Sequence, residues 1–143
     1  MSWQAFIERL TDKIDGTKPS PVEEAAICGI ELGKESVWAS TTGAAITVEE
    51  IKKLASEQRS DFAQNGVHVF GRRCRLIRDQ LDVEGVFMMD LKTAADAEGN
   101  TYGVCVSKTK TAIIVVRGTK DANGGQLSTR VYSVADYLRG LHV

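Results

Sequence analysis

The amino-acid sequence predicts an α+β fold in which helices cover a central antiparallel β-sheet. Three observations support this prediction. Apolar residues recur at helical spacing at both ends of the chain, short strand-like runs separated by turn residues fill the second half, and no internal repeat is present. The 143 residues are enough for one hydrophobic core, so we expect a single domain over residues 1–143.

The chain begins with a predicted helix over residues 3–14. Apolar side chains recur at helical spacing from Trp3 to Ile14. Ser2 is placed to cap the first turn, and Asp15-Gly16 is placed to end the helix.

Two strands and a second helix are predicted next. After a loop over residues 17–21, segments 24–32 and 36–40 are typical of strands joined by a glycine-containing turn. Thr47 and Glu50 have the spacing of a capping box, and an apolar stripe follows them, so a helix is expected to start here.

The middle of the chain is predicted to form an antiparallel meander. Asn65-Gly66 suits both central positions of a type I′ turn, so we expect a tight hairpin there. Four strand-like runs separated by short turns follow, at residues 74–81, 86–92, 101–107 and 111–118. The run at residues 112–116 is apolar at consecutive positions, as expected of a strand buried on both faces.

The chain ends in a predicted helix with Ser128 as its N-cap. Leu127 and Tyr132 then occupy the positions of a hydrophobic staple. The apolar stripe of this helix consists of Val131, Val134, Ala135, Leu138 and Leu141.

Composition and charge exclude several classes of protein. A net charge of −1 provides no overall field to attract nucleic acid, so a charged partner has to meet a local patch. Cys28, Cys74 and Cys105 are odd in number and lack metal-ligand spacing, which favours reduced thiols. The N-terminal segment does not resemble a signal peptide, and no run approaches the ~20 apolar residues of a membrane span, so we expect a cytoplasmic protein.

The sequence contains no catalytic motif that we can identify. It has no G-x-S-x-G or H-E-x-x-H sequence, and His68 and His142 are interpreted as an ordinary strand residue and an ordinary terminal residue. Gly124-Gly125 lacks the spacing of a phosphate-binding loop and is interpreted as a connection. We therefore expect no enzyme activity, no cofactor and no metal.

Basic residues gather at Arg72, Arg73, Arg75 and Arg78. Strict alternation would place Arg73 and Arg75 on one sheet face and Arg78 on the other, so a continuous patch requires a bulge. Such a patch suits an acidic protein surface or a phosphoinositide headgroup, and a solvated sheet face is the alternative. Further basic residues occur at Lys92, Arg117, Lys120 and Arg130.

The few aromatic residues raise the question of a shared groove. Trp3, Phe6, Trp38 and Tyr137 would meet if the two terminal helices packed side by side beside the early strand that carries Trp38. Such a groove suits a polyproline II ligand, which is stiff before it binds. Ordinary core packing of the same rings is the alternative.

Several segments in this order resemble the profilin family: SWQAFIERL, AAICGI, SVWAS, RSDFAQNGVHVFGRRCRLIRDQL, FMMDLKT, SKTKTAIIV and the Gly124-Gly125 loop before the terminal helix. The resemblance covers nearly the whole chain, and the loop at residues 17–21 is longer than in vertebrate members. It implies a central antiparallel sheet, with the N- and C-terminal helices on one face and the internal helices on the other.

The resemblance also implies a function and two binding surfaces. The chain is expected to bind monomeric actin, regulate actin polymerisation, speed nucleotide exchange on actin and recruit proline-rich proteins such as formins, with phosphoinositides (phosphatidylinositol phosphates) on a basic patch. The proline-rich groove carries over onto Trp3, Phe6, Trp38, Tyr137 and Leu138, with Val143 where vertebrate members have Tyr. The residues proposed for the phosphoinositide come from the basic cluster itself and are Arg73, Arg75 and Arg78.

The actin surface carries over onto Arg73, Leu76, Ile77, Arg78, Lys92, Asn123, Gly124 and Arg130. The chain departs from the family pattern at Ala63, Val86, Ala94, Asn123 and Ser133, which removes charge and contact area. A related small α+β module that binds phosphoinositides or another ligand, with weak or no actin binding, is the alternative function. We expect a monomer, because no heptad seam is visible.

Overall fold

The structure is a computed structural model that describes residues 3–12 and 20–143. The elements follow in the order α1 (Trp3–Thr11), β1 (Val22–Gly29), β2 (Ser36–Ser40), α2 (Val48–Ala55), α3 (Phe62–Asn65), β3 (Val67–Val69), β4 (Arg72–Gln80), β5 (Met88–Thr93), β6 (Gly103–Lys108), β7 (Ala112–Gly118) and α4 (Gly124–Gly140). The strands form one seven-stranded antiparallel sheet in the order β2-β1-β7-β6-β5-β4-β3.

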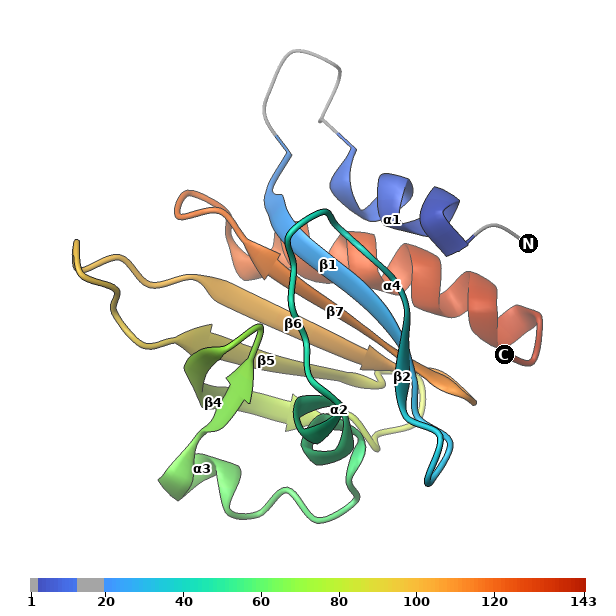
Figure 1. The fold of residues 1–143 in the computed structure, drawn as a ribbon. Helices are drawn as coiled ribbons and strands as arrows, with labels where there is room; N and C mark the ends of the chain where they lie inside the picture. The colour runs from blue at the N-terminus through green and yellow to red at the C-terminus, as the bar shows by residue number, and fades with distance from the viewer. Residues whose placement is uncertain (1–2, 13–19) are drawn as a thin grey trace.

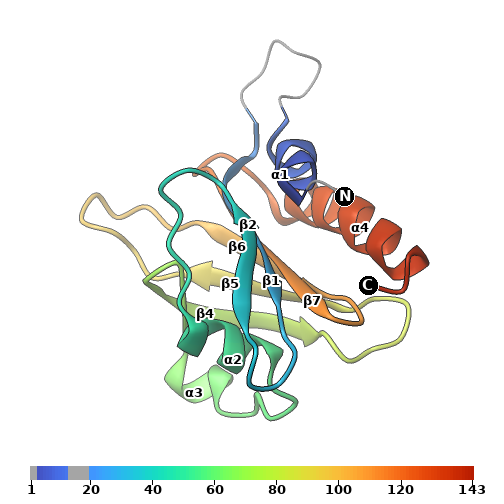
Figure 2. The same ribbon diagram turned by 45° about the vertical axis from the view of Figure 1, so that its right-hand side comes forward.

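Helices cover both faces of the sheet (Figures 1 and 2). The terminal helices α1 and α4 lie side by side on one face, and the internal helices α2 and α3 lie on the other. The predicted α+β arrangement is confirmed.

Two hydrophobic cores result, one on each face of the sheet. Ile51 of α2 belongs to one core, and Leu138 of α4 belongs to the other. We call these the α2 core and the α4 core, after the helix that covers each. All residues of β7 are buried, because Ile113 faces the α2 core and Ile114 faces the α4 core. The prediction that residues 112–116 are buried on both faces is confirmed.

The first helix is shorter than predicted, because α1 ends at Thr11 and not at residue 14. The Thr11 hydroxyl donates to the carbonyls of Ile7 (2.9 Å) and Glu8 (3.4 Å), and a longer helix would need the Glu8 carbonyl for the N–H of residue 12. The predicted cap at Ser2 and the predicted stop at Asp15-Gly16 lie outside the described residues.

The first strand is also displaced from its predicted position at residues 24–32. β1 begins at Val22, which pairs with Gly118 of β7, and it ends at Gly29. The next residues form a turn, in which the Lys34 N–H donates to the Glu31 carbonyl (2.8 Å). The later strands agree better with the prediction, since the observed ends of β4 to β7 lie within two residues of the predicted ends.

The predicted type I′ turn at Asn65-Gly66 is wrong. Asn65 is the last residue of α3, and Gly66 is its C-cap, with a φ of 70° and its N–H donating to the Phe62 carbonyl (3.0 Å). The hairpin between β3 and β4 turns instead at Phe70 and Gly71, whose φ angles are 53° and 75°. A glycine with positive φ suits a helix end as well as a turn, so the dipeptide alone does not distinguish the two.

Capping boxes start both α2 and α4. The box predicted at Thr47 and Glu50 is confirmed. The N-cap predicted at Ser128 is wrong, because α4 starts about one turn earlier with Asn123 as its cap. The Asn123 side chain accepts from the Gln126 N–H (2.9 Å), and the Gln126 side chain accepts from the Asn123 N–H (2.9 Å).

This earlier start changes the roles predicted for three apolar residues. Leu127 is buried and Tyr132 is 43% exposed, so the two do not form the predicted staple. Leu141 was predicted in the buried stripe, but it caps the C-terminal end of α4 and is 42% exposed.

Candidate functional site

Four aromatic rings from three distant segments form a continuous row at one end of the molecule. The ring centroids are 4.7 Å apart for Trp3 and Trp38, 5.8 Å for Trp3 and Phe6, and 5.7 Å for Phe6 and Tyr137. The interplanar angles of 40°, 44° and 43° are tilted arrangements, which aromatic pairs favour over face-to-face stacking. We call these four residues the aromatic strip.

Local backbone features aim Trp38 into the strip. Trp38 is the extra residue of a β-bulge, because Ile27 pairs with Ala39 and Cys28 pairs with Val37. Its indole lies directly on Gly29, where an added Cβ would be 2.6 Å from the Trp38 Nε1. A glycine at this position therefore makes room for the ring.

The strip residues differ in how much surface they offer to a ligand. Tyr137 is 50% exposed, Trp3 and Trp38 are half-buried, and only 7% of Phe6 is exposed. Leu138 was predicted to line the groove, but it is fully buried in the core beneath it. In this structure its side chain supports the strip from below.

One residue of the strip's surroundings was missed by the sequence prediction. Arg9 places its guanidinium carbon 5.9 Å from the Phe6 ring centroid and 5.7 Å from that of Tyr137. The sequence does contain a signal for the contact with Phe6, because Arg9 lies three residues after Phe6 on a predicted helix and side chains at this spacing are neighbours. The distance to Tyr137 on α4 was not visible in the sequence.

A second bulge places Arg75 and Arg78 of β4 on one face of the sheet. Arg75 pairs with Lys92, Arg78 pairs with Asp90, and Ile77 is the extra residue between them. Since Lys92 and Asp90 are two residues apart on β5, Arg75 and Arg78 face the same way. This is the bulge that the predicted continuous patch requires.

These side chains border a hollow of about 870 Å³ between the sheet and the start of α4. Its lining includes six residues predicted for the two charged sites together with Asp90 and Lys120; the six are Arg75, Ile77, Arg78, Lys92, Asn123 and Gly124. Arg78 donates to Asp90 (3.1 Å) but keeps 66% of its side chain exposed. We call this region the basic hollow.

Three residues predicted for the actin surface do not line the basic hollow. Arg73 lines a separate hollow of about 260 Å³ together with Ala63 and Ala94, two of the positions that depart from the family pattern. Leu76 faces the opposite side of the sheet and packs against the α2 core. Arg130 donates to the Leu10 carbonyl (3.1 Å) and ties α4 to α1.

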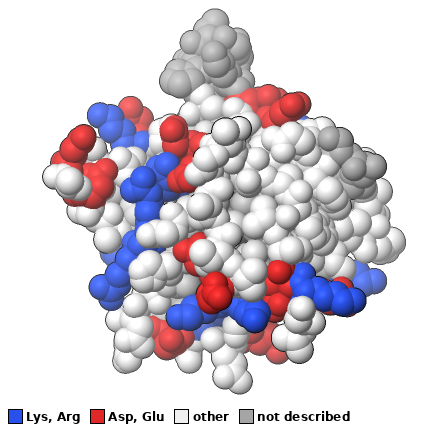
Figure 3. Space-filling view, viewed as in Figure 1, with Lys and Arg blue, Asp and Glu red and all other residues white. Residues whose placement is uncertain are grey.

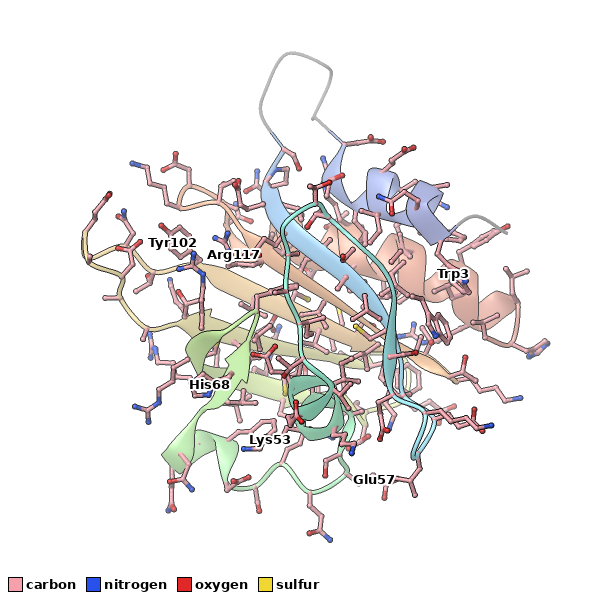
Figure 4. The ribbon with its side chains drawn as sticks, in the orientation of Figure 1. Trp3, Lys53, Glu57, His68, Tyr102 and Arg117 are labelled. Atoms are coloured by element: carbon pink, nitrogen blue, oxygen red, sulfur yellow. The ribbon has the colours of Figure 1, made fainter. Side chains whose placement is uncertain are left out.

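Another cation and aromatic cluster lies at the far end of the sheet, where Tyr102 and Arg117 are labelled in Figure 4. The guanidinium carbons of Arg72 and Arg117 lie 5.5 and 4.9 Å from the Tyr102 ring centroid. Arg117 is buried and pairs with Glu24 (2.5 Å), and the Tyr102 hydroxyl donates to Asp96 (2.8 Å). These groups are held by one another within the fold.

The charge distribution separates the aromatic end from the basic regions. Figure 3 shows Lys and Arg in a band down one side of the molecule, whereas a broad area on the other side is uncharged. Tyr137, in the C-terminal half of α4, belongs to the aromatic strip. Asn123, at the N-terminal end of α4, lines the basic hollow.

The described cysteines are buried thiols. Burial, with Glu50 as a second cause, raises the pKa of Cys28 to about 12. Burial also raises the pKa of Cys105. Residues 3–12 and 20–143 contain no group of three His, Cys, Asp or Glu side chains that could hold a metal ion. None of the described helices is long and apolar enough to cross a membrane.

Fold and sites together define a small α+β binding protein with an aromatic strip at one end of its terminal helix and a basic hollow at the other. The profilin family model matches residues 1–143. Human Profilin-1 is 35% identical over 140 residues, which cover 96% of this chain and 95% of the relative. The chain therefore belongs to the profilin family, whose members are actin-binding regulators of actin polymerisation. The resemblance seen in the sequence is confirmed.

Solved profilin structures share the fold. Mouse profilin IIa, in complex with a double repeat from the FH1 domain of mDia1, superposes with a TM-score of 0.88 at 33% identity and full coverage of both chains (100% and 100%). Human profilin II gives a TM-score of 0.85 at 34% identity, covering 97% of this chain and 99% of that one.

Proposed function

We propose that the protein is an adaptor that holds monomeric actin at the basic hollow while the aromatic strip binds proline-rich segments of assembly factors such as formins. The single observation that carries this proposal is the continuous row of rings built from α1, β2 and α4. Rings from three separate segments converge at the edge of the core beneath α4, where Phe6 is buried and Trp3, Trp38 and Tyr137 stay partly exposed. Residues 1–143 would act together as one unit in this role.

The aromatic strip suits a polyproline II helix for physical reasons. The ligand is stiff before binding and carries solvated carbonyls, so it needs flat apolar faces and a few donors. The rings of Trp3 and Trp38 supply the faces, and the exposed hydroxyl of Tyr137 is available as a donor. Phe6 has no hydroxyl, so it contributes a ring edge only. Val143 packs against the core that contains Phe6.

The basic hollow suits an acidic protein surface. Arg75, Arg78 and Lys92 share one sheet face, and the exposed Ile77 adds apolar contact area beside them. We infer that actin binds here, with Arg73 at the rim of the neighbouring hollow. Binding is expected to favour an actin state with a more open nucleotide cleft, and the protein itself catalyses nothing.

The same arginines are proposed to bind phosphoinositides. Arg73, Arg75 and Arg78 offer planar donor groups that match phosphate oxygens. Because the two ligands would share these residues, phosphoinositide and actin are expected to compete. A phosphoinositide module without actin binding is the weaker candidate, since the whole chain matches a family of actin-binding proteins. We propose a cytoplasmic, cytoskeleton-associated monomer that has no cofactor and no nucleic-acid partner.

Titration of tryptophan fluorescence with a decaproline peptide tests the strip. Trp3→Ala and Trp38→Ala are expected to weaken binding by about tenfold or more, because buried aromatic anchors carry most of the energy of such interfaces. Arg78→Glu is the matched control and should bind the peptide normally. The same variant should lose affinity for monomeric actin. A wild-type protein that ignores millimolar peptide would refute the adaptor role.

A further inference from the structure

Arg9 places a positive charge at the end of the aromatic strip formed by Phe6 and Tyr137. Its guanidinium carbon lies within 6 Å of two rings, at 5.9 Å from Phe6 and 5.7 Å from Tyr137. The Arg9 side chain is exposed at the surface of α1. The row of rings therefore begins at Trp38 and finishes beside a positive charge.

Within residues 3–12 and 20–143, most of the hydrogen-bonding capacity of Arg9 is unused. A guanidinium has five N–H donors, and the hydrogen bond found for Arg9 is a long one of 3.3 Å to the Ser133 hydroxyl. The ion pairs among residues 3–12 and 20–143 do not include Arg9. Three exposed carboxylates belong to or follow these helices, namely Glu8 in α1, Asp12 directly after it and Asp136 in α4, and none of them forms an ion pair with Arg9.

We infer that Arg9 binds a carboxylate that flanks the proline-rich segment, so that the protein prefers proline-rich ligands with Asp or Glu at the end lying over Phe6 and Tyr137. This inference rests on the proposed function of the strip. A guanidinium fork matches a carboxylate with two parallel hydrogen bonds, and the neighbouring rings hold the fork in place. Phe6 offers no hydroxyl to compete for the same acceptor.

Five peptides with blocked termini test this preference: decaproline alone, decaproline with two Glu residues at either end, and decaproline with two Lys residues at either end. Because the ion pair is exposed, one Glu-flanked peptide is expected to bind about twofold to fivefold more tightly than decaproline. The Lys peptide flanked at the same end should bind more weakly. Raising NaCl to about 0.5 M should reduce both differences.

Two variants attribute the effect to Arg9. Arg9→Gln keeps a side chain of similar length but removes the charge, so it should abolish the preference while decaproline still binds. Lys53→Gln removes one positive charge from α2 on the opposite face, where Figure 4 labels Lys53, and should leave the preference unchanged. Arg9→Lys keeps the charge without the fork and should retain part of the preference.

The outcomes separate this inference from the function on which it rests. If decaproline binds but the Glu-flanked peptides bind no better, or if Arg9→Gln keeps the preference, then Arg9 does not read the flanking charge and the strip still stands. If none of the peptides binds, the strip is not a proline-rich site and both proposals fall.

Discussion

At the scale of single residues, a buried arginine joins two parts of the chain that are distant in sequence. Arg59 is 7% exposed and donates to Asp79 (2.8 Å) and to Asp82 (2.6 Å). It also bonds the Ser56 carbonyl, so it ties the segment after α2 to the end of β4. Basic and acidic residues at these positions show no special pattern in the sequence, and the contact was therefore not predicted.

Because of this contact, the stability of the fold depends on pH in the acid range. Burial acts to raise the pKa of Asp79, but the hydrogen bonds from Arg59 and from the Leu81 N–H prevail and lower it. A carboxyl whose pKa is lower in the folded state stabilises the fold above its unfolded pKa of about 3.9 and loses that contribution as pH falls through the folded value.

Asp79→Asn tests this linkage. The variant is expected to lower the free energy of unfolding by about 2 kcal/mol at pH 7, because Arg59 loses one of its two charged partners. The difference from wild type should shrink as pH falls from 5 toward 2, since the wild-type carboxylate is then protonated. Urea denaturation at pH 7, 5 and 3 measures it, and a difference that does not change with pH would contradict the assignment.

At the scale of elements, the sequence predicted the strands and helices better than their ends. Apolar spacing is a local signal, and it located every strand of the meander. Bulges, caps and turns depend on neighbours that are remote in sequence. Asn65-Gly66 ends a helix because Phe62 is anchored in the core, and the bulge at Ile77 follows from the pairing of β4 with β5.

The contact between β1 and β2 yields a prediction for Gly29. Gly29→Ala would bring a methyl group within 2.6 Å of the Trp38 indole, so the ring has to move out of the strip. Affinity for decaproline is expected to fall by about tenfold, with a folding cost of about 1–3 kcal/mol. Fluorescence titration and thermal unfolding measure the two effects.

Gly124→Ala is the control for this substitution. A Cβ at Gly124 meets no other atom within 4 Å, and the residue lies at the opposite end of α4 from Tyr137. Decaproline affinity should be unchanged in this variant. Equal affinities for Gly29→Ala and wild type would show that the position of Trp38 does not matter for the ligand.

The start of α4 yields a second prediction at this scale. Asn123→Ala removes the side chain that caps the helix and is expected to lower stability by about 1 kcal/mol, or roughly 3 °C in Tm. Asn123→Asp keeps an acceptor at the cap and should be close to wild type. Calorimetry of both variants measures the change in Tm. If both variants lose the same stability, the helix cap is not its source.

At the scale of the whole molecule, α4 separates the two proposed surfaces. The helix has 17 residues, a length of about 25 Å, with Asn123 at the basic hollow and Tyr137 in the aromatic strip. The sequence raised the question of a shared groove, but it could not show that Trp3, Trp38 and Tyr137 meet, because they come from α1, β2 and α4. Only the packing of both terminal helices on one face of the sheet brings them together.

Simultaneous binding of both partners tests this arrangement most directly. Fluorescein-labelled decaproline is sedimented with the protein and monomeric actin, and the dye is followed. Peptide, protein and actin are expected to sediment together, whereas Trp3→Ala should release the peptide and Arg78→Glu should release the actin. Displacement of the peptide by actin, or of actin by the peptide, would contradict the claim that one small domain holds two ligands on separate surfaces.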